Sequence, residues 1–300
     1  MRTRTRVGGV QDPSGGSEAR RRRSAVAVAL GGGAALLALV FTTAAYAAVP
    51  GLERVATTSE FNPENVKVNG APCPVGKRLL GGGGDIFGGL GQVEMDRLRP
   101  GPFGLTVIAN EDEDGTDDNW MVHTYSICAD PIPGLEIVAA TGPSNSNNKH
   151  MTAACPAGKR LVGAGGEIVG EESLVVMNDL IPNPELTKVV VRGVENQNGT
   201  ADDWLVRAYA ICANPLPGLE LATGAGANDS APGKLGVTTC PAGKRVLGAG
   251  AEITGGLGQV VLDDMTPNAG LTSVTVTGRE DQDGTAEDWR ARAYAICANA

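Results

Sequence analysis

Three observations predict an all-β fold built from three homologous repeats of four to five strands each. One unit recurs three times, and each copy opens with Pro-Gly-Leu-Glu, at Pro50, Pro133 and Pro217. Runs of β-branched residues bounded by turn residues, such as 187–192 and 272–277, are typical of strands. No stretch after residue 47 shows a convincing 3.6-residue apolar period, so no helix is expected there.

The three repeats share their cysteine, tryptophan and tyrosine positions. Each contains Cys-Pro-x-Gly-Lys-Arg and ends with Trp, then Tyr-x-Ile-Cys-Ala, and the Pro-Gly-Leu-Glu motifs recur at periods of 83 and 84 residues. Self-similarity at a fixed period is the mark of a repeat architecture. We place the repeats at residues 48–132, 133–216 and 217–300.

How the repeats pack is less determined by the sequence. One twisted sheet of this size cannot bury both of its faces alone. We therefore predict a pseudo-threefold β-prism in which each repeat contributes one sheet. The alternative is three tandem small β-sandwich domains joined by linkers such as 214–237.

Residues 1–47 have the composition of an export signal. Four arginines at 20–23 precede an apolar run over 24–45, and Ala45-Tyr46-Ala47 places small residues where signal peptidase cuts. The protein is therefore expected to be secreted and extracellular. The alternative is an uncleaved membrane anchor at 24–45, because about 20 apolar residues span a bilayer.

The charge of the chain excludes one class of partner. The whole sequence carries a net charge of −9, and cleavage after residue 47 removes seven arginines and two acids, leaving 18 basic and 32 acidic residues, a net charge of −14. A surface of this charge repels anionic polymers and anionic lipids. We expect no nucleic-acid partner, and no membrane contact after cleavage.

Six cysteines in an exported chain are expected to form disulfides. The repeat symmetry leaves two simple schemes. In one, each repeat is stitched to the next, which requires a closed ring. The favoured scheme closes each repeat on itself, with the pairs Cys73–Cys128, Cys155–Cys212 and Cys240–Cys297.

Each repeat carries one tryptophan, five residues before a tyrosine: Trp120, Trp204 and Trp289. An odd spacing places the two rings on opposite faces of a strand. Trp204 shares its face with small apolar residues and with Cys212, so we expect the tryptophans in the core. The alternative is an exposed platform for stacking on sugar rings.

An acidic turn precedes each tryptophan and is the best candidate for a metal site. Oxygen-bearing side chains stand two apart before a glycine, at Asp112 and Asp114, Asn196 and Asn198, and Asp281 and Asp283. This spacing is similar to the start of a calcium loop, but the third ligand pair and the bidentate Glu at position twelve are missing. Asp-Gly and Asn-Gly also suit a tight hairpin turn. We therefore expect no cofactor, with weak calcium binding by these turns as the alternative.

Two further features recur in every repeat. A glycine-rich segment such as 81–84 leads to Asp85, Glu167 or Glu252, twelve residues after the first cysteine. These glycines favour close strand packing or a bulge over a phosphate cradle. The Lys-Arg pairs at 77–78, 159–160 and 244–245 are expected to pair with nearby acids.

The unit Cys-Pro-Ala-Gly-Lys-Arg…Trp…Tyr-Ala-Ile-Cys-Ala resembles repeats in exported bacterial proteins that mostly lack an assigned function. The resemblance covers residues 50–300 and implies no catalytic residues. Three four-stranded repeats are also similar in plan to the β-prism of vitelline membrane outer layer proteins and some lectins.

These observations favour a non-catalytic extracellular protein with a structural or surface-interaction role. The two histidines, His123 and His150, have no counterparts in the other repeats, and no Gly-x-Ser-x-Gly motif occurs. A lectin-like protein that binds cell-wall or other glycans through three equivalent copies is the alternative. A carboxylate-dependent hydrolase ranks third. The sequence leaves the oligomeric state open.

Overall fold

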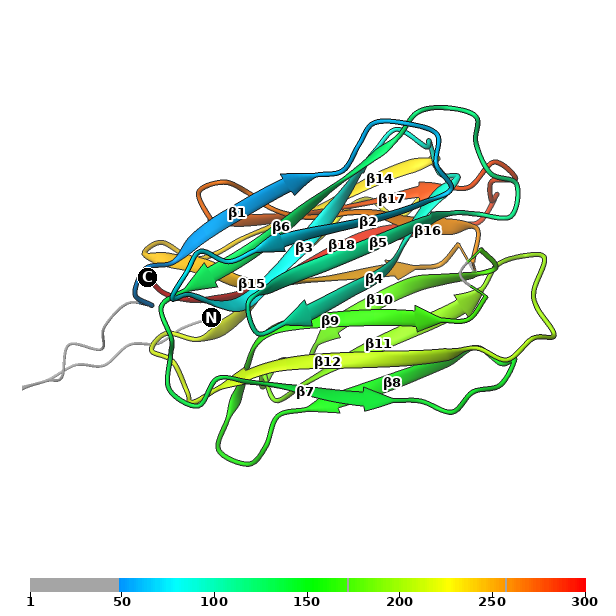
Figure 1. Cartoon of the computed structure of the whole chain (residues 1–300). Coiled ribbons are helices and arrows are strands. Elements are labelled where there is room, and N and C mark those ends of the chain that lie inside the picture. Colours follow the sequence, from blue (N-terminus) through cyan, green and yellow to red (C-terminus); the bar gives the residue numbers. More distant parts are fainter. Residues whose placement is uncertain (1–48, 172, 257) are drawn as a thin grey trace, which may run out of the picture. The chain divides into compact units, whose positions relative to one another are not determined.

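The structure, a computed structural model, describes residues 49–300 except 172 and 257 (Figure 1). The described residues form 18 strands and no helix, which confirms the predicted all-β class. From Val49 onward they belong to one compact unit. The predicted export signal or anchor at 1–47 lies outside the described residues.

Each repeat contains six strands, rather than four or five. Repeat 1 holds β1 (Glu53–Thr58), β2 (Val66–Pro72), β3 (Arg78–Phe87), β4 (Val93–Gly101), β5 (Gly104–Glu111) and β6 (Met121–Ala129). Repeat 2 holds β7 (Glu136–Thr141), β8 (Lys149–Ala154), β9 (Arg160–Val169), β10 (Val175–Pro182), β11 (Lys188–Glu195) and β12 (Leu205–Ala213). Repeat 3 holds β13 (Glu220–Ala225), β14 (Gly233–Thr239), β15 (Lys244–Thr254), β16 (Val260–Pro267), β17 (Ser273–Glu280) and β18 (Arg290–Asn299).

The strand that sequence analysis missed is the first of each repeat, β1, β7 or β13. It is an edge strand of its sheet and shows little of the alternation between buried and exposed residues that identifies a strand.

The 18 strands form three six-stranded antiparallel sheets, and every sheet is shared by two repeats. The first, third and sixth strands of a repeat enter one sheet, and the second, fourth and fifth enter another. The strand orders are β1-β6-β3-β16-β17-β14, β13-β18-β15-β10-β11-β8 and β2-β5-β4-β9-β12-β7. The expectation that each repeat supplies one whole sheet is therefore wrong. Each repeat folds as a small sandwich of two three-stranded halves, and each half pairs edge to edge with a half from a neighbouring repeat. This arrangement buries apolar faces between the halves and pairs strand edges that would otherwise be exposed.

The repeats meet around a pseudo-threefold axis, which is lined by three equivalent glycines, Gly81, Gly163 and Gly248. A Cβ on Gly163 would lie 1.9 Å from the Leu80 carbonyl oxygen, and one on Gly81 would lie 2.7 Å from the Gly248 Cα. Each glycine also follows a register shift in its strand pairing. Close packing and a bulge thus coincide at these glycines, as the sequence analysis predicts for the glycine-rich segments.

The three disulfides close within repeats: Cys73–Cys128, Cys155–Cys212 and Cys240–Cys297. Each first cysteine directly follows the second strand of its repeat, whereas the second cysteine lies on the sixth strand. Because those two strands belong to different sheets, each disulfide ties together the two sheets that one repeat shares.

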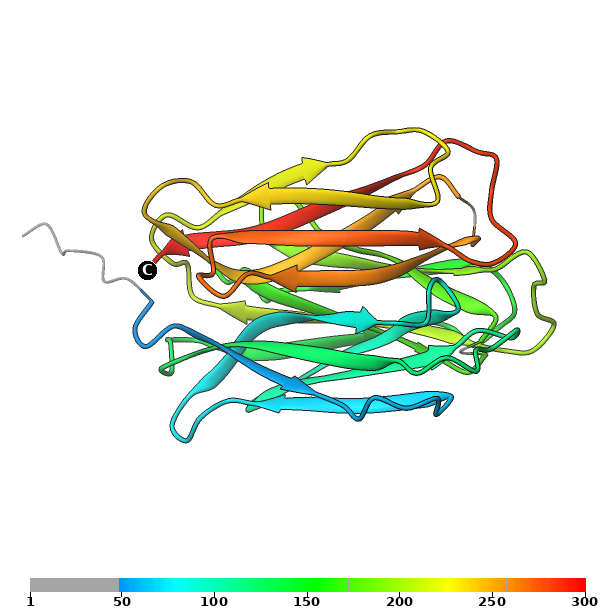
Figure 2. The same cartoon turned by 90° about the horizontal axis from the view of Figure 1, so that it is seen from above.

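The strands run between two ends of this unit (Figures 1 and 2). At one end lie Val49 and the last residues of the chain, where the Val49 amide donates to the Asn299 carbonyl oxygen at 3.1 Å. At the other, here called the turn end, lie the acidic turns that lead into β6, β12 and β18.

A candidate binding site where the three acidic turns meet

The tryptophans are fully buried, and each is held by the same two partners. The indole N–H of Trp120, Trp204 and Trp289 donates to a glutamate carboxylate nine residues earlier in the chain. These carboxylates belong to Glu111, Glu195 and Glu280, at 3.0, 3.1 and 2.7 Å.

The second partner is a lysine ammonium that lies over the face of each indole ring. The distances from Nζ to the ring centroid are 4.5 Å for Lys67, 3.4 Å for Lys149 and 4.6 Å for Lys234. Burial lowers the pKa of Lys67 and Lys149 from the ordinary lysine value. The indole rings therefore pack in the core beneath each turn, and no ring face is accessible for stacking against a sugar.

Sequence analysis did not single out these glutamates and lysines. The glutamates carry a usable signal, because Glu stands nine residues before Trp in all three repeats. The lysines precede the first cysteine by six residues in every repeat. Their contact with the indole depends on how the second strand packs over the sixth.

Each acidic turn is a tight turn capped by its own first residue. The Asp112 carboxylate accepts hydrogen bonds from the amides of Asp114 and Gly115, at 3.1 and 2.9 Å. Asn196 and Asp281 accept from Gly199 and Gly284 in the same way. The three glycines have φ between 60° and 65°, the left-handed region that glycine enters without strain. The Asp-Gly and Asn-Gly pairs therefore suit a tight turn, but the predicted hairpin is wrong, because the strands before and after each turn belong to different sheets.

The three turns also contact one another, which the sequence did not indicate. Glu113 of the first turn accepts hydrogen bonds from the side-chain amides of Asn196, at 2.8 and 2.7 Å, and Asn198. Gln197 of the second turn donates to Asp283 of the third at 2.8 Å. Gln282 of the third turn accepts from Gln92 of repeat 1 at 2.5 Å, which completes a ring around the axis.

Glu94 lies inside this ring and is 2% exposed. Neither of its carboxylate oxygens has a hydrogen-bond donor among the described residues. The positions equivalent to Glu94 in repeats 2 and 3 are valines, Val176 and Val261, which are buried against each other and Val194. An unpartnered buried carboxylate is costly, about 1–3 kcal/mol or more.

The surroundings of Glu94 are acidic. Burial, with Asp96, Asp112, Glu113 and Asp281 adding to it, raises the pKa of Glu94 well above its ordinary value. Burial also raises the pKa of Asp112 to about 6 and raises that of Asp281, although backbone amides oppose the shift in both turns. At the turn end, burial and mutual repulsion therefore favour the uncharged, protonated form of these carboxylates.

A small cavity of about 10 Å³ lies among these side chains. Its lining comes from all three repeats: Glu94, Asp112, Glu113, Asp114, Val176, Asn196, Gln197, Gly258, Val261 and Asp281. A volume of this size holds roughly one water molecule or one ion. Within the described part of the chain, no group of three or more His, Cys, Asp or Glu side chains is arranged as a metal centre.

The acid twelve residues after the first cysteine lies at each junction between two repeats. Glu167 is 1% exposed and accepts from Tyr209 at 2.6 Å, from Arg207 at 2.9 Å and from Arg99. Burial opposes ionisation of Glu167, but the hydrogen bonds from Tyr209 and Arg99 outweigh it and lower the pKa. Glu252 has the equivalent partners Tyr294 and Arg292, the latter at 3.4 Å, whereas Asp85 pairs with His123 at 2.8 Å. The partners of Glu167 thus engage both oxygens of its carboxylate at the junction between repeats 1 and 2.

The lysines of the Lys-Arg pairs form ion pairs with the glutamates of the Pro-Gly-Leu-Glu motifs. The distances are 2.5 Å for Lys77–Glu53, 2.7 Å for Lys159–Glu136 and 3.0 Å for Lys244–Glu220. Of the arginines, Arg78 lies 4.5 Å over the ring of Phe103. The two motifs thus contact each other at the end that carries Val49 and the last residues of the chain.

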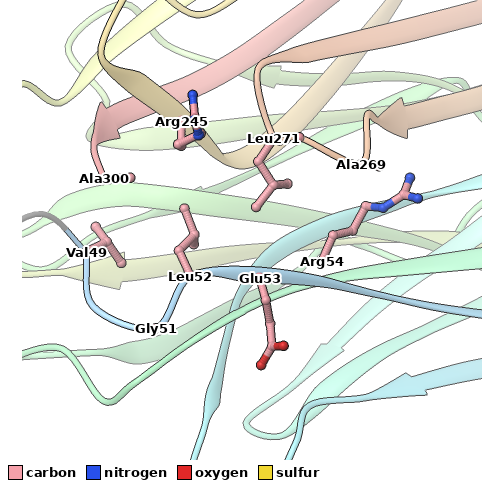
Figure 3. A pocket seen from close by; sticks show the side chains of 10 residues that line it. Val49, Gly51, Leu52, Glu53, Arg54, Arg245, Ala269, Leu271 and Ala300 are labelled. Atoms are coloured by element: carbon pink, nitrogen blue, oxygen red, sulfur yellow. The ribbon is translucent and has the colours of Figure 1, made fainter.

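A larger cavity of about 590 Å³ opens at that same end, between the start of repeat 1 and repeat 3 (Figure 3). Leu52 and Leu271 lie in its middle, while Glu53 points away from it toward its lysine partner. Arg54 donates to the Pro267 carbonyl oxygen at 2.8 Å and covers the ring of Tyr125. The Arg54 guanidinium therefore joins repeat 1 to repeat 3.

No protein-family model matches the chain, and no curated protein matches it. Across residues 49–300, apart from the two undescribed positions, no helix has the length and apolar character needed to span a membrane.

Proposed function

We propose that the protein is exported and acts outside the cytoplasm as a non-catalytic structural or surface-interaction protein. The observation that carries this proposal is that the repeated motifs hold together the strands, turns and sheets of each repeat. The cysteines join two sheets within each repeat, the tryptophans anchor the turns, and the Lys–Glu pairs join successive motifs. Three disulfides fit an oxidising environment, where such bonds persist.

Carbohydrate binding through the tryptophans is not part of the proposal. Their rings are 0% exposed and each is covered by a lysine ammonium, so a sugar ring has no aromatic face to stack on. Glu167, one of the carboxylates that a hydrolase could use, is enclosed by two arginines and a tyrosine. These two contacts favour a framework role for the residues that drew attention in the sequence.

Expression of the full chain in a bacterial host that secretes proteins tests the proposal. We expect the culture medium to contain a form that begins at Ala48, carries no free thiol and hydrolyses no cell-wall glycan. Recovery of the chain in the cytoplasm with reactive thiols would contradict export. Turnover of a glycan that Glu167→Gln abolishes in the folded protein would contradict the non-catalytic role.

A further inference from the structure

We propose that the turn end binds one divalent cation of the calcium class on the pseudo-threefold axis, held by Glu94 together with Asp112, Asn196 and Asp281. This site goes beyond the proposed function, and neither depends on the other. It also differs from three separate calcium loops, because its ligands come from all three repeats.

The first support is the buried carboxylate of Glu94. Its two oxygens have no hydrogen-bond donor among the described residues, although the side chain is 2% exposed. Burying a carboxylate without a partner is unfavourable, so such groups pair with a cation or coordinate a metal. The other two repeats show the ordinary solution at this position, which is a valine packed in the core.

The second support is the chemistry and size of the cavity that Glu94 lines. The ten lining residues supply carboxylate, amide and backbone oxygens and apolar contacts, and none is a lysine, arginine, histidine or cysteine. Oxygen donors of this kind select hard cations such as Ca²⁺. A volume of about 10 Å³ admits a single ion.

The third support is the ring of hydrogen bonds that holds the turns together. Glu113, Gln197 and Gln282 each bond across to another repeat, so the first residues of the turns are positioned around one point. Asp112 and Asp281 line the same cavity as Glu94, so three carboxylates repel one another around it. A bound dication removes that repulsion, and the exposed ends of the turns provide the freedom to close on it.

Calcium titration of the mature chain, stripped of metal with a chelator, tests the site. We expect calorimetry to give one Ca²⁺ per chain. We also expect the melting temperature to rise by roughly 5–10 °C when free Ca²⁺ is one hundred times the dissociation constant. Mg²⁺, which demands a tighter octahedral shell, should produce a smaller rise.

Two variants of the axial carboxylate and one control complete the experiment. Glu94→Val introduces the residue that repeats 2 and 3 already carry, so it should fold and lose the calcium-dependent rise. Glu94→Gln, which is closer in shape, should lose it as well. Asp117→Asn changes an exposed acid of the first turn outside the cavity lining and should keep it.

Two results would overturn the axial site. One is a melting temperature that Ca²⁺ leaves unchanged in the wild-type protein. The other is a calcium response that survives both Glu94 variants, above all with three ions per chain, which would assign binding to the separate turns.

Discussion

Asp179 of β10 lies directly opposite Glu252 of β15, at the junction where repeats 2 and 3 share a sheet. The equivalent pair at the junction of repeats 3 and 1 is Asp264 opposite Asp85. Between repeats 1 and 2, Arg97 lies opposite Glu167 instead. Two of the three junctions thus place like charges across neighbouring strands, an arrangement that weakens strand pairing.

This charge arrangement predicts that the protein is more stable at pH 5.5 than at pH 8. Burial raises the pKa of Asp179 to about 7. The charge of Arg192 opposes this shift, and the charge of Glu252 adds to it. Burial raises the pKa of Asp263 to about 7 as well. The folded state therefore binds protons that the unfolded state releases, so the free energy of unfolding increases as the pH falls through 7. Each proton contributes up to about 1.4 kcal/mol per pH unit, and thermal melts from pH 8 to pH 5.5 measure it.

Asp179→Asn is the matched variant for this pH dependence. It should raise the melting temperature at pH 8 and flatten the rise toward pH 5.5, because the amide carries no charge to neutralise. A melting temperature of the wild-type protein that falls over this pH range would contradict the interpretation.

Gly163→Ala should destabilise the protein by about 3 kcal/mol or more, because the new methyl group would meet the backbone of Leu80 and Gly81 on the axis. Gly233→Ala is the control, since no atom lies within 4 Å of a Cβ at that position. Urea denaturation of the two variants compares them. Equal midpoints would show that the axis tolerates a side chain.

An isolated repeat, residues 133–216, should not melt cooperatively at the temperature of the whole protein. Without repeats 1 and 3, β9 and β10 lose the neighbouring strands β4 and β15 and expose unpaired edges. Circular dichroism of the fragment during heating measures this. A sharp transition that coincides with that of residues 48–300 would favour three independent sandwiches.

Replacing Cys155 and Cys212 together by alanine should lower the free energy of unfolding by roughly 4 kcal/mol, because the bond closes a loop of 57 residues. Thiol titration of the denatured, unreduced wild-type protein should find no free thiol. Two or more reactive thiols per chain would show that the bonds are not formed in the secreted protein.

Tryptophan fluorescence should be blue-shifted, resistant to acrylamide and unaffected by oligosaccharides, because all three indoles are fully buried. Glu195→Ala should shift the emission of Trp204 and lower stability by about 1–3 kcal/mol, since the buried indole N–H loses its acceptor. Sugar-dependent quenching that Trp204→Ala removes from a folded protein would instead establish a lectin.

Local patterns were sufficient to predict the all-β class and the close packing of the glycine-rich segments. A run of β-branched residues between turn residues predicts a strand from local sequence alone. A cysteine or tryptophan that recurs at one period predicts the same environment in each repeat. The missed first strands, β1, β7 and β13, are short edge strands without strong alternation, and their conformation depends on pairing with the sixth strand far along the chain.

The sequence by itself determined that this protein is all-β, threefold repeated and supplied with paired cysteines. Only the tertiary structure decided that every sheet is shared by two repeats and that the acidic turns surround Glu94. The residues of different turns that hydrogen-bond to each other are 83 to 86 positions apart in the sequence. The physical reason is that secondary structure follows from neighbouring residues. Sharing of sheets, and the approach of three turns to one axis, follow from which unpaired edges and apolar faces can be buried against each other.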